Sequence, residues 1–403
     1  MTGNGQDDAS SHCNHFVMRK KRYCRMTVKP GDKFCGEHQP PSEAAADKTD
    51  GKVRIVCPLD PKHTCYAHNL KKHLKICNAR PGEALPYIEK GVNSGGKDDA
   101  DLDSYKLLST FSTNEIMGVI QKINKIFEEL LDGKVTRKLA THGVVEAEMA
   151  KPEYGDKTKK HLKQASAILG LLVEYDLIKP NICYVEFGAG RGHLSYWLAQ
   201  AAEEASFLLV ERSSPKHKRD NKLDKTDDKV QRIRADIADL ILDKVEAISR
   251  SDFIVGVTKH LCGDATDLAL RCLSNVSQQQ TKVLGCIMTF CCHHRCRWAS
   301  YTGKDFFEGV DLTKNDFDMM CGMTSWATCG TGFSREKNSE SLQTKTEILN
   351  ERDKEIGLNR DQKEEVGRRC KSILNWGRLQ YLEKMGFQCF LHYYVDADVS
   401  LEN

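Results

Sequence analysis

Four residues near the start of the sequence have the chemistry and spacing to hold one zinc ion. They are Cys57, His63, His73 and Cys77, in the pattern Cys-x5-His-x9-His-x3-Cys. Structural zinc takes four thiolate and imidazole ligands in tetrahedral geometry, and His73 and Cys77, four residues apart, share one face of a helix. The pattern predicts a CHHC-type zinc finger over residues 54–80. A ligand set that uses Cys65 or His68 is the alternative.

A second set of four ligands precedes the first. It consists of Cys13, Cys24, Cys35 and His38. The spacing Cys-x10-Cys-x10-Cys-x2-His is typical of a small domain wrapped round one ion, and it predicts a CCCH-type zinc finger over residues 11–40. A tail with chance cysteines is the alternative. Both zinc ions are expected to be structural.

The surroundings of these two sets are basic. Residues 11–80 contain fifteen Lys and Arg against six Asp and Glu, interleaved with aromatic residues. Lysine and arginine gain affinity for phosphates by releasing counterions. We therefore expect a nucleic acid, rather than a protein, as the partner of this end of the chain.

A glycine-rich turn, VEFGAGRG over residues 185–192, follows an apolar segment. Its glycines are Gly188, Gly190 and Gly192. They allow backbone amides to approach a ligand at the end of a strand. Glu211 ends the next apolar segment, where a carboxylate can accept hydrogen bonds from ribose hydroxyls, and Asp236 ends the one after, where an acid can meet an adenine amino group.

The same turn argues against a phosphate-bearing cofactor. Glu186 would repel a pyrophosphate, and the turn lacks the Lys-Ser/Thr ending of a phosphate-binding loop. We therefore expect S-adenosylmethionine, with Glu186 and the three glycines among the residues that bind it. A dinucleotide site and a purely structural turn are the alternatives.

A fourth apolar segment leads into KHLCGDATDLALRCL, residues 259–273, which carries candidate catalytic residues. In open α/β sheets, ligands collect outside the carboxyl ends of the strands, which places Lys259, His260 and Asp267 beside the cofactor. Methylation of a sugar hydroxyl requires loss of its proton, and a buried lysine or a histidine can accept it. Lys259 or His260 is the expected acceptor. Asp267 either contributes to catalysis or caps the following helix.

The fifth apolar segment ends in Cys-Cys-His-His-Arg-Cys, residues 291–296. Four soft ligands within six residues are hard to wrap round a single ion without help from elsewhere in the chain. We expect this motif to form a wall of the active site, with His293 or His294 facing the substrate. A third zinc site is the alternative.

Strands and helices alternate in the part of the chain that would position these residues. Apolar segments that predict strands lie at 182–187, 206–211, 230–236, 252–258 and 283–290. The alternation predicts an α/β fold with a parallel sheet covered on both faces. Together with the expected S-adenosylmethionine site, it indicates a Rossmann-like class I methyltransferase domain over residues 157–397. A helix at 373–384 and a strand at 387–395 should close it, and the charged residues 331–365 predict a flexible insertion.

Two segments connect the fingers to this domain. Residues 81–110 have the Gly, Ser and Asp content of a linker. Residues 111–156 are expected to be a helical connector, because isoleucines at 116, 120 and 123 recur at helical spacing. We expect that helix to pack against the main body or to form a short coiled coil.

Size and composition set further limits. The 403 residues suggest two or three domains, and the net charge is +3. The 17 cysteines are an odd number, many lie close to histidines, and the N-terminus lacks a secretory profile, so we expect a reduced, intracellular protein of the nucleus or the cytoplasm. No apolar run approaches the ~18 residues of a membrane span.

The order of motifs resembles the eukaryotic tRNA 2′-O-methyltransferases that modify nucleotide 4 of the acceptor stem. The motifs are RKKRYC, CPLDPKHT, KHLKQASAIL, VEFGAGRG, KHLCGDATDLALRCL, CCHHRC, SWATCG and GRLQYLEKMGF, spread over most of residues 13–395. The resemblance implies methyl transfer from S-adenosylmethionine to a ribose 2′-hydroxyl of certain tRNAs, with fingers that seat the tRNA by its backbone and shape.

The resemblance also bears on the catalytic residues. Other ribose methyltransferases of this fold place lysines and an aspartate around the attacking hydroxyl, which implies Lys160 or Lys163, Lys259 and Asp267. The alternative from another class is a zinc-finger RNA-binding adapter with an inactive methyltransferase-like domain. Binding of S-adenosylmethionine distinguishes the two.

Overall fold

The computed structural model divides the chain into two compact units, Met1–Leu85 and Pro86–Asn403. The residues that the structure describes are 12–17, 22–28, 31–35, 38, 54–77, 85–95, 104–223, 229–278, 282–329 and 356–400. Within these ranges, no helix combines the length and apolar character that crossing a membrane requires.

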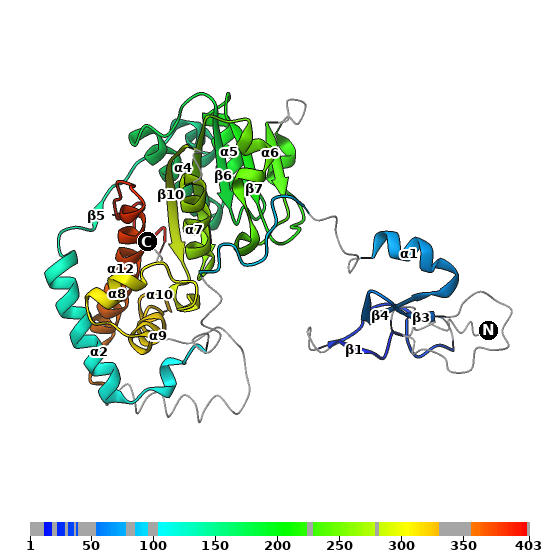
Figure 1. The fold of residues 1–403 in the computed structure, drawn as a ribbon, viewed down its shortest axis with the longest axis horizontal. Coiled ribbons are helices and arrows are strands. Elements are labelled where there is room, and N and C mark those ends of the chain that lie inside the picture. Colours follow the sequence, from blue (N-terminus) through cyan, green and yellow to red (C-terminus); the bar gives the residue numbers. More distant parts are fainter. Residues whose placement is uncertain are drawn as a thin grey trace, which may run out of the picture. The chain divides into compact units, whose positions relative to one another are not determined.

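A five-stranded parallel sheet forms the centre of the larger unit (Figure 1). Its strands are β6 (Ile182–Phe187), β7 (Ser206–Val210), β8 (Val230–Ile233), β9 (Phe253–Cys262) and β10 (Lys282–Cys291). They lie in the order β10-β9-β6-β7-β8. The chain leaves β6 on one side to form β7 and returns on the other side to form β9, so the strand order reverses between β6 and β9. Ligands of such sheets bind at this switch point.

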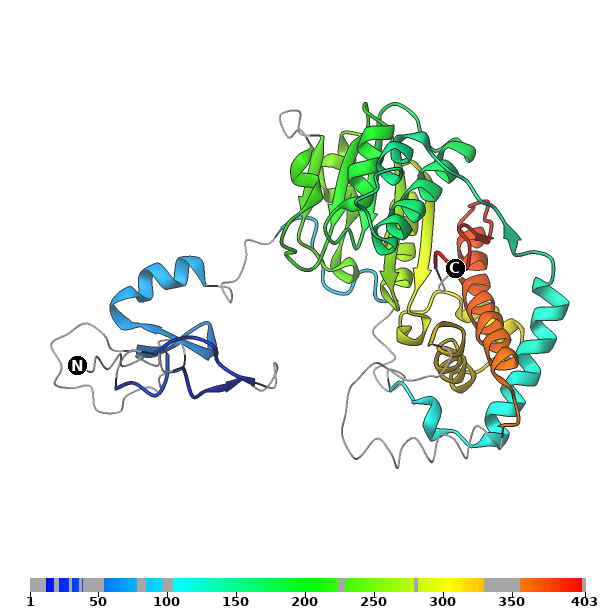
Figure 2. The same ribbon diagram turned by 180° about the vertical axis from the view of Figure 1, so that it is seen from behind.

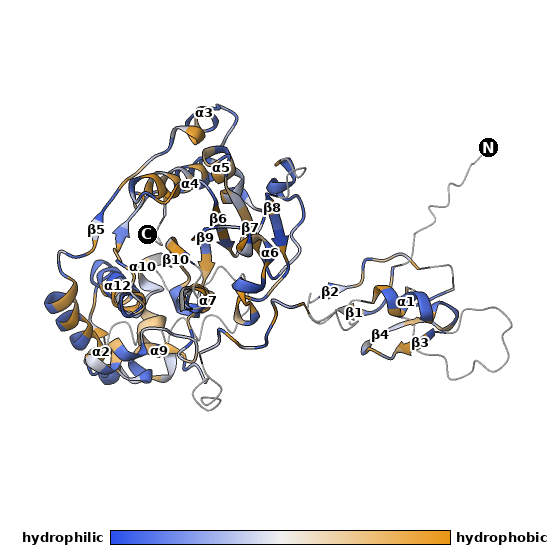
Figure 3. Cartoon of the chain, turned by 45° about the horizontal axis from the view of Figure 1, so that its top comes forward, coloured by the Kyte–Doolittle hydropathy of each residue, from blue (hydrophilic) through white to orange (hydrophobic). Residues whose placement is uncertain are grey.

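Helices cover both faces of the sheet. One face carries α4 (Asp156–Glu174) and α5 (His193–Ala201), and the other carries α6 (Glu246–Ser249) and α7 (Ala265–Gln278). β6 is buried along its whole length, as expected for a strand with helices on both sides. Hydrophobic residues are concentrated on the central strands, while α4 and α12 carry both kinds of residue (Figure 3). The predicted α/β fold with a parallel sheet is confirmed.

A second core joins helices from distant parts of the sequence. It contains α2 (Thr113–Ile126), α8 (Lys304–Gly309), α9 (Lys314–Met323), α10 (Trp326–Cys329) and α12 (Arg360–Lys384). Both ribbon views show α2 lying alongside α12 (Figures 1 and 2). The isoleucines of α2 face this core, so the helix packs against the main body, as expected.

The C-terminal part differs from the prediction in two ways. The last helix, α12, starts at Arg360 rather than 373, because Asn359 and Gln362 form a capping box. The rest of the proposed insertion, 331–355, lies outside the described residues. In the segment 387–395 only His392–Tyr393 (β11) is a strand, and it pairs with β5 (Thr136–Arg137) instead of the main sheet. A cavity of about 390 Å³ lies between β10 and this segment.

Part of the predicted linker belongs to the larger unit. Ile88 forms an isolated bridge with Leu240, and the Asn93 side-chain amide donates to the carbonyls of Ile237 and Leu240 at 2.7 and 2.8 Å. Asn93 is buried. Residues 87–93 therefore pack on the connection after β8.

The smaller unit consists of short elements. They are β1 (Phe16–Val17), β2 (Arg22–Tyr23), β3 (Arg54–Cys57), β4 (Asp60–Tyr66), the short 3-10 helix η2 (Ala67–Asn69) and α1 (Leu70–Ile76). β1 pairs with β2, and β3 pairs with β4, both antiparallel. The cysteines at 13, 35, 57 and 77 are buried although the unit has few apolar residues to bury.

Candidate active site and metal sites

The four CHHC residues meet at one point between the β3–β4 hairpin and α1. The Sγ atoms of Cys57 and Cys77 are 3.8 Å apart, and the Nε2 atoms of His63 and His73 are 3.2 Å apart. Zinc bonds of 2.0–2.3 Å in tetrahedral geometry separate the ligand atoms by about 3.3–3.8 Å. The set therefore has the dimensions of a zinc site. Asp60 Oδ2 lies 3.4 Å from Nδ1 of His63, as a carboxylate that orients a metal-binding histidine does.

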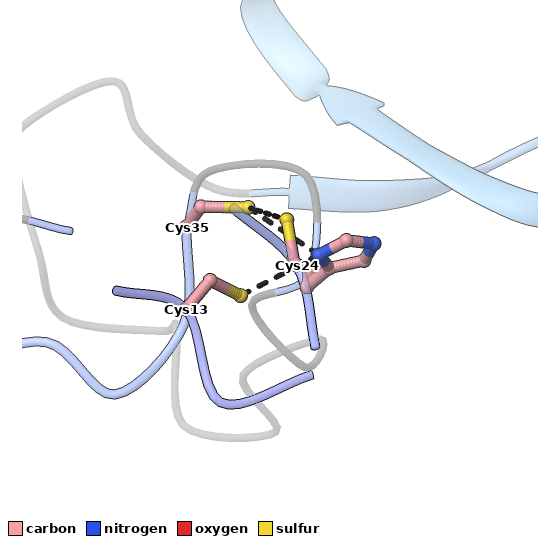
Figure 4. Close-up of side chains that lie close together, drawn as sticks. Cys13, Cys24 and Cys35 are labelled. Atoms are coloured by element: carbon pink, nitrogen blue, oxygen red, sulfur yellow. Dashed lines mark hydrogen bonds between the residues drawn. The ribbon is translucent and has the colours of Figure 1, made fainter. Parts of the chain in front are cut away.

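The CCCH residues also converge (Figure 4). Sγ of Cys24 lies 4.0 Å from Sγ of Cys35, and Nδ1 of His38 lies 3.4 Å from Cys35 Sγ and 3.5 Å from Cys13 Sγ. The ring of His15 stacks on that of His38 with centroids 3.9 Å apart. Three thiols and one imidazole at these distances fit a second structural zinc ion. Among the described residues, neither Cys65 nor His68 belongs to a group of metal-ligand geometry.

The glycine-rich turn connects β6 to α5 in a left-handed backbone conformation. The φ angles of Gly188, Gly190 and Gly192 are +65°, +50° and +70°. A side chain at Gly188 would place Cβ 3.0 Å from Leu261, whereas Cβ at Gly190 would meet nothing nearer than 3.9 Å. The turn therefore needs glycine at 190 for its conformation and at 188 also for its close approach to the end of β9.

Two carboxylates lie at the ends of the neighbouring strands. Glu211 Oε2 accepts a hydrogen bond from the Gly190 amide at 2.9 Å, and its Oε1 accepts from the amide and hydroxyl of Ser213. Burial opposes ionisation of Glu211, but these hydrogen bonds outweigh it and lower its pKa. Asp236 accepts from the Ala238 amide at 3.1 Å. Glu211 thus directly follows β7 and bonds to the turn, whereas Asp236 lies three residues after β8.

Glu186 lies on β6, just before the turn, and bonds to the start of α5. It is 4% exposed and accepts hydrogen bonds from the amide of Ser195, at 3.0 Å, and from the Ser195 hydroxyl. Burial raises the pKa of Glu186 to about 7, although the bonds from Ser195 and the charge of Lys259 act in the opposite direction. Its carboxylate therefore holds the first turn of α5 in place.

Lys259 lies at the centre of a group of ionisable side chains from four elements. Val257 on β9 pairs with Glu186 near the end of β6, and Lys259 lies two residues after Val257. Burial lowers the pKa of Lys259, and Glu186 partly opposes this shift. Burial and then the charge of Lys259 lower the pKa values of His161 on α4 and His193 on α5.

His260 belongs to the same group. Its ring meets that of His161 edge to face, with centroids 5.9 Å apart. Burial, followed by the charge of Lys259, lowers the pKa of His260 to about 4. The side chains of His161, His193 and His260 are exposed while Lys259 is half-buried, so solvent and a ligand can reach this group. Sequence reasoning missed His161 and His193, although His161 lies in the motif KHLKQASAIL and His193 directly follows the glycine turn.

The other predicted catalytic residues lie elsewhere. Lys160 is exposed and donates to the backbone carbonyl of Asp398, and Lys163 is also exposed. Asp267 is completely buried and forms an ion pair with Arg378 at 2.7 Å, while Thr302 donates to it from its amide and hydroxyl. The structure thus gives Asp267 a structural role between α7 and α12, which does not support the catalytic prediction.

The CCHHRC motif divides into separate environments. His293 is 2% exposed, and its Nε2 lies 3.0 Å from Asn375 Oδ1, so it faces the core rather than a substrate. Burial lowers its pKa to about 3. Cys296 accepts from Arg378 at 3.0 Å. His293 therefore does not face the substrate, whereas the other predicted residue, His294, is exposed and stays a prediction.

Three protein-family models match the chain. The model of methyltransferase TRM13 matches residues 163–403, more than half of the chain. The CCCH zinc finger in TRM13 protein matches residues 11–39, and the U11-48K-like CHHC zinc finger matches residues 54–78. The two finger models cover all eight predicted zinc ligands.

Curated relatives are similar over nearly the whole chain. The mouse tRNA:m(4)X modification enzyme TRM13 homolog is 35% identical over 450 residues, which cover 97% of this chain and 92% of that protein. The human homolog is 34% identical, with 98% and 94% covered. The Kluyveromyces lactis enzyme TRM13 is 28% identical, with 100% and 96% covered.

A solved structure is much less similar. A geranyl diphosphate C-methyltransferase from Streptomyces coelicolor A3(2) shares 16% sequence identity with this chain. The alignment covers 41% of this chain and 60% of that chain, and its TM-score of 0.23 indicates little structural similarity. The family assignment rests on the sequence matches, which agree with the parallel sheet and the two zinc-ligand clusters. The chain therefore belongs to the TRM13 family of methyltransferases.

Proposed function

We propose that the chain transfers a methyl group from S-adenosylmethionine to the ribose 2′-hydroxyl of nucleotide 4 in the acceptor stem of certain tRNAs. The names of the relatives describe them as tRNA:m(4)X modification enzymes. The observation that carries the proposal is the position of Lys259, which lies beside the glycine turn at the switch point of the sheet. That position is where a substrate meets a cofactor in this fold.

The residues at the turn fit S-adenosylmethionine. A Cβ atom at Gly190 would meet nothing nearer than 3.9 Å, so there is space beside this part of the turn, and Glu211 and Asp236 follow the ends of β7 and β8. The turn lacks the Lys-Ser/Thr ending of a phosphate-binding loop, and the acidic Glu186 lies just before it. The cofactor, when bound, supplies an electrophilic methyl group. Gly188, Gly190, Glu211 and Asp236 are the residues that would hold it.

Lys259 acts on the hydroxyl that is to be methylated. In its charged form the ammonium group can orient the ribose oxygen, and in its neutral form it can accept the proton. Because burial lowers its pKa, more of the lysine is neutral near pH 7 than for a lysine in water. Because their pKa values are lowered, His161 and His193 add less positive charge beside the lysine than histidines in water would.

The finger unit is proposed to hold the tRNA. Lys71, Lys72 and Lys75 are exposed on α1, while His73 and Leu74 are less exposed. This arrangement presents positive charge to a phosphate backbone and keeps the ligand histidine at the metal site. Thiolate ligands persist in reducing compartments, so we place the protein in the nucleus or the cytoplasm.

Lys259→Ala tests the catalytic assignment. The purified variant and the wild type are incubated with labelled S-adenosylmethionine and unmodified tRNA, and cofactor binding is measured separately. We expect methyl transfer to fall by roughly 10²–10⁴-fold, the range of an acid–base residue, with cofactor binding retained. Lys179→Ala, at a surface ion pair with Asp176, is the matched control and should keep full activity. Normal turnover of Lys259→Ala contradicts the assignment.

The pH dependence and the product give independent tests. If neutral Lys259 accepts the proton, kcat rises with pH until the lowered pKa of the lysine is passed. A rate that does not change with pH in the neutral to mildly alkaline range contradicts this role. Nuclease mapping of the product tRNA should place the methyl group on a ribose, and a methylated base would overturn the proposed reaction.

A further inference from the structure

Three cysteines that neither finger uses meet at the carboxyl ends of two neighbouring strands. Cys262 ends β9 and Cys291 ends β10, and the two residues are paired in register. Their Sγ atoms are 3.3 Å apart, and the sulfur of Cys292 completes a group whose ligand atoms all lie within 4.8 Å of one another. Cys262 is exposed and Cys291 is buried.

The backbone at Cys292 explains how two consecutive cysteines reach one point. Side chains of consecutive residues in an extended strand point to opposite faces of the sheet. Cys292 instead adopts a left-handed conformation with φ 53° and ψ 43°, which is unfavourable for a residue with a Cβ atom. The turn brings its thiol to the same cluster. Strained conformations of this kind are frequent at functional sites.

A second turn keeps the two strand ends together. Gly263 follows Cys262 with φ +61°, and a Cβ atom there would lie 2.7 Å from the carbonyl oxygen of Arg295. The close approach leaves no room for a side chain at this position. The two strand ends are therefore held in contact by packing that does not depend on the sulfur atoms.

We propose that Cys262, Cys291 and Cys292 form a third metal site, which binds Zn²⁺ through three thiolates. The ligand atoms of the two fingers are 3.2–4.0 Å apart, and the sulfurs of Cys262 and Cys291 lie within the same range. Three soft sulfur ligands are typical of zinc among the abundant cellular ions. Each thiol gives up its proton to solvent when the ion binds.

The proposed site has an open position. Among the described residues, no histidine or carboxylate joins the three cysteines in the group. A zinc ion with three protein ligands leaves its fourth position for water or another small ligand. Because Lys259 lies three residues before Cys262 on β9, the ion would also fix the strand end that presents this lysine.

A disulfide between Cys262 and Cys291 is the competing interpretation. A disulfide would use only the sulfurs of Cys262 and Cys291, and it would not explain the left-handed conformation of Cys292. A metal site uses all three thiols and accounts for the turn.

The test counts zinc in the full-length chain. The protein is purified in reducing buffer with zinc, dialysed to remove loosely bound ions, and analysed by mass spectrometry for zinc per chain. We expect three zinc ions for the wild type, one for each cluster, and two for Cys262→Ser. Cys286→Ser, on the same strand β10 but outside the cluster, is the matched control and should keep three.

Cys292→Gly keeps the test independent of folding defects. Glycine adopts the left-handed conformation without strain, so this variant should fold as well as the wild type and still lose one zinc ion. Two zinc ions in the wild type, or three in both Cys262→Ser and Cys292→Gly, overturn the proposal. A Cys262–Cys291 disulfide found by peptide mapping in protein prepared without oxidant also overturns it.

Discussion

Replacing Asp267 by Asn distinguishes a structural carboxylate from a catalytic one. Asp267 and Arg378 are 0% and 1% exposed, and the guanidinium donates to both carboxylate oxygens, at 2.7 and 3.1 Å. Asn at this position keeps an oxygen that can accept from Thr302 but removes the negative charge. The variant therefore leaves a buried guanidinium without its counter-ion.

The size of the effect follows from the burial. Breaking a buried ion pair by removing one partner destabilises a protein by about 3–5 kcal/mol. Asn375 Oδ1 accepts from Arg378 at 2.9 Å and remains in the variant, so we expect a loss near the lower end, about 3 kcal/mol. The surface pair Asp305–Lys384 has the same 2.7 Å separation but is 74% and 59% exposed. Asp305→Asn should therefore lower the free energy of unfolding by less than ~1 kcal/mol.

Urea unfolding followed by tryptophan fluorescence measures both variants, and methyl transfer is measured at a temperature where each is folded. Asp267→Asn should keep its activity per folded molecule. Adding Arg378→Met should restore much of the lost stability, because the unpaired charge is then absent. If Asp267→Asn is as stable as Asp305→Asn but transfers methyl groups at least ~100-fold more slowly, the structural role is refuted and the carboxylate is catalytic.

Two further predictions concern Glu186 and the CHHC ligands. The pKa of Glu186 is raised from 4.5 to about 7, so its protonated form favours the native state at low pH, and this contribution is lost as the pH rises through 7. The stability of Glu186→Gln relative to the wild type should therefore increase by up to about 3 kcal/mol in free energy of unfolding between pH 5 and pH 8. If urea titrations give the same stability difference between variant and wild type at both pH values, Glu186 ionises normally. Cys77→Ser should remove one zinc ion per chain while Cys65→Ser removes none, and equal zinc contents of the two variants would contradict the ligand assignment.

Local patterns predicted the sheet well because each strand is a short apolar run bounded by turn residues. The strand expected at 182–187 is β6 without change, and β9 and β10 each extend only a few residues beyond the predicted limits. The segment 387–395 is equally apolar, but its partner, β5, lies about 250 residues earlier in the chain. Strand periodicity indicates an extended conformation and does not identify the neighbour with which it pairs.

The metal ligands were predictable for a related reason. All four CHHC residues lie within 21 residues of sequence, so their spacing alone indicates one ion. The cluster of Cys262, Cys291 and Cys292 has no such local signal, because its members become neighbours only when β9 and β10 pair. Sequence reasoning accordingly treated the cysteines of 291–296 as one group, whereas the structure divides them between two environments.

The stretch from Lys259 to Asp267 shows where prediction from sequence ends. All its polar residues follow one strand, so each is a reasonable catalytic candidate when considered alone. The structure assigns them different roles through partners that are distant in sequence: Lys259 lies near Glu186, and Asp267 is neutralised by Arg378, 111 residues away. Asp267 is completely buried and both of its carboxylate oxygens are bonded to Arg378, so it does not face a substrate. Lys259 and His260, which lie beside the glycine turn, are therefore the residues of this stretch on which the proposed chemistry depends.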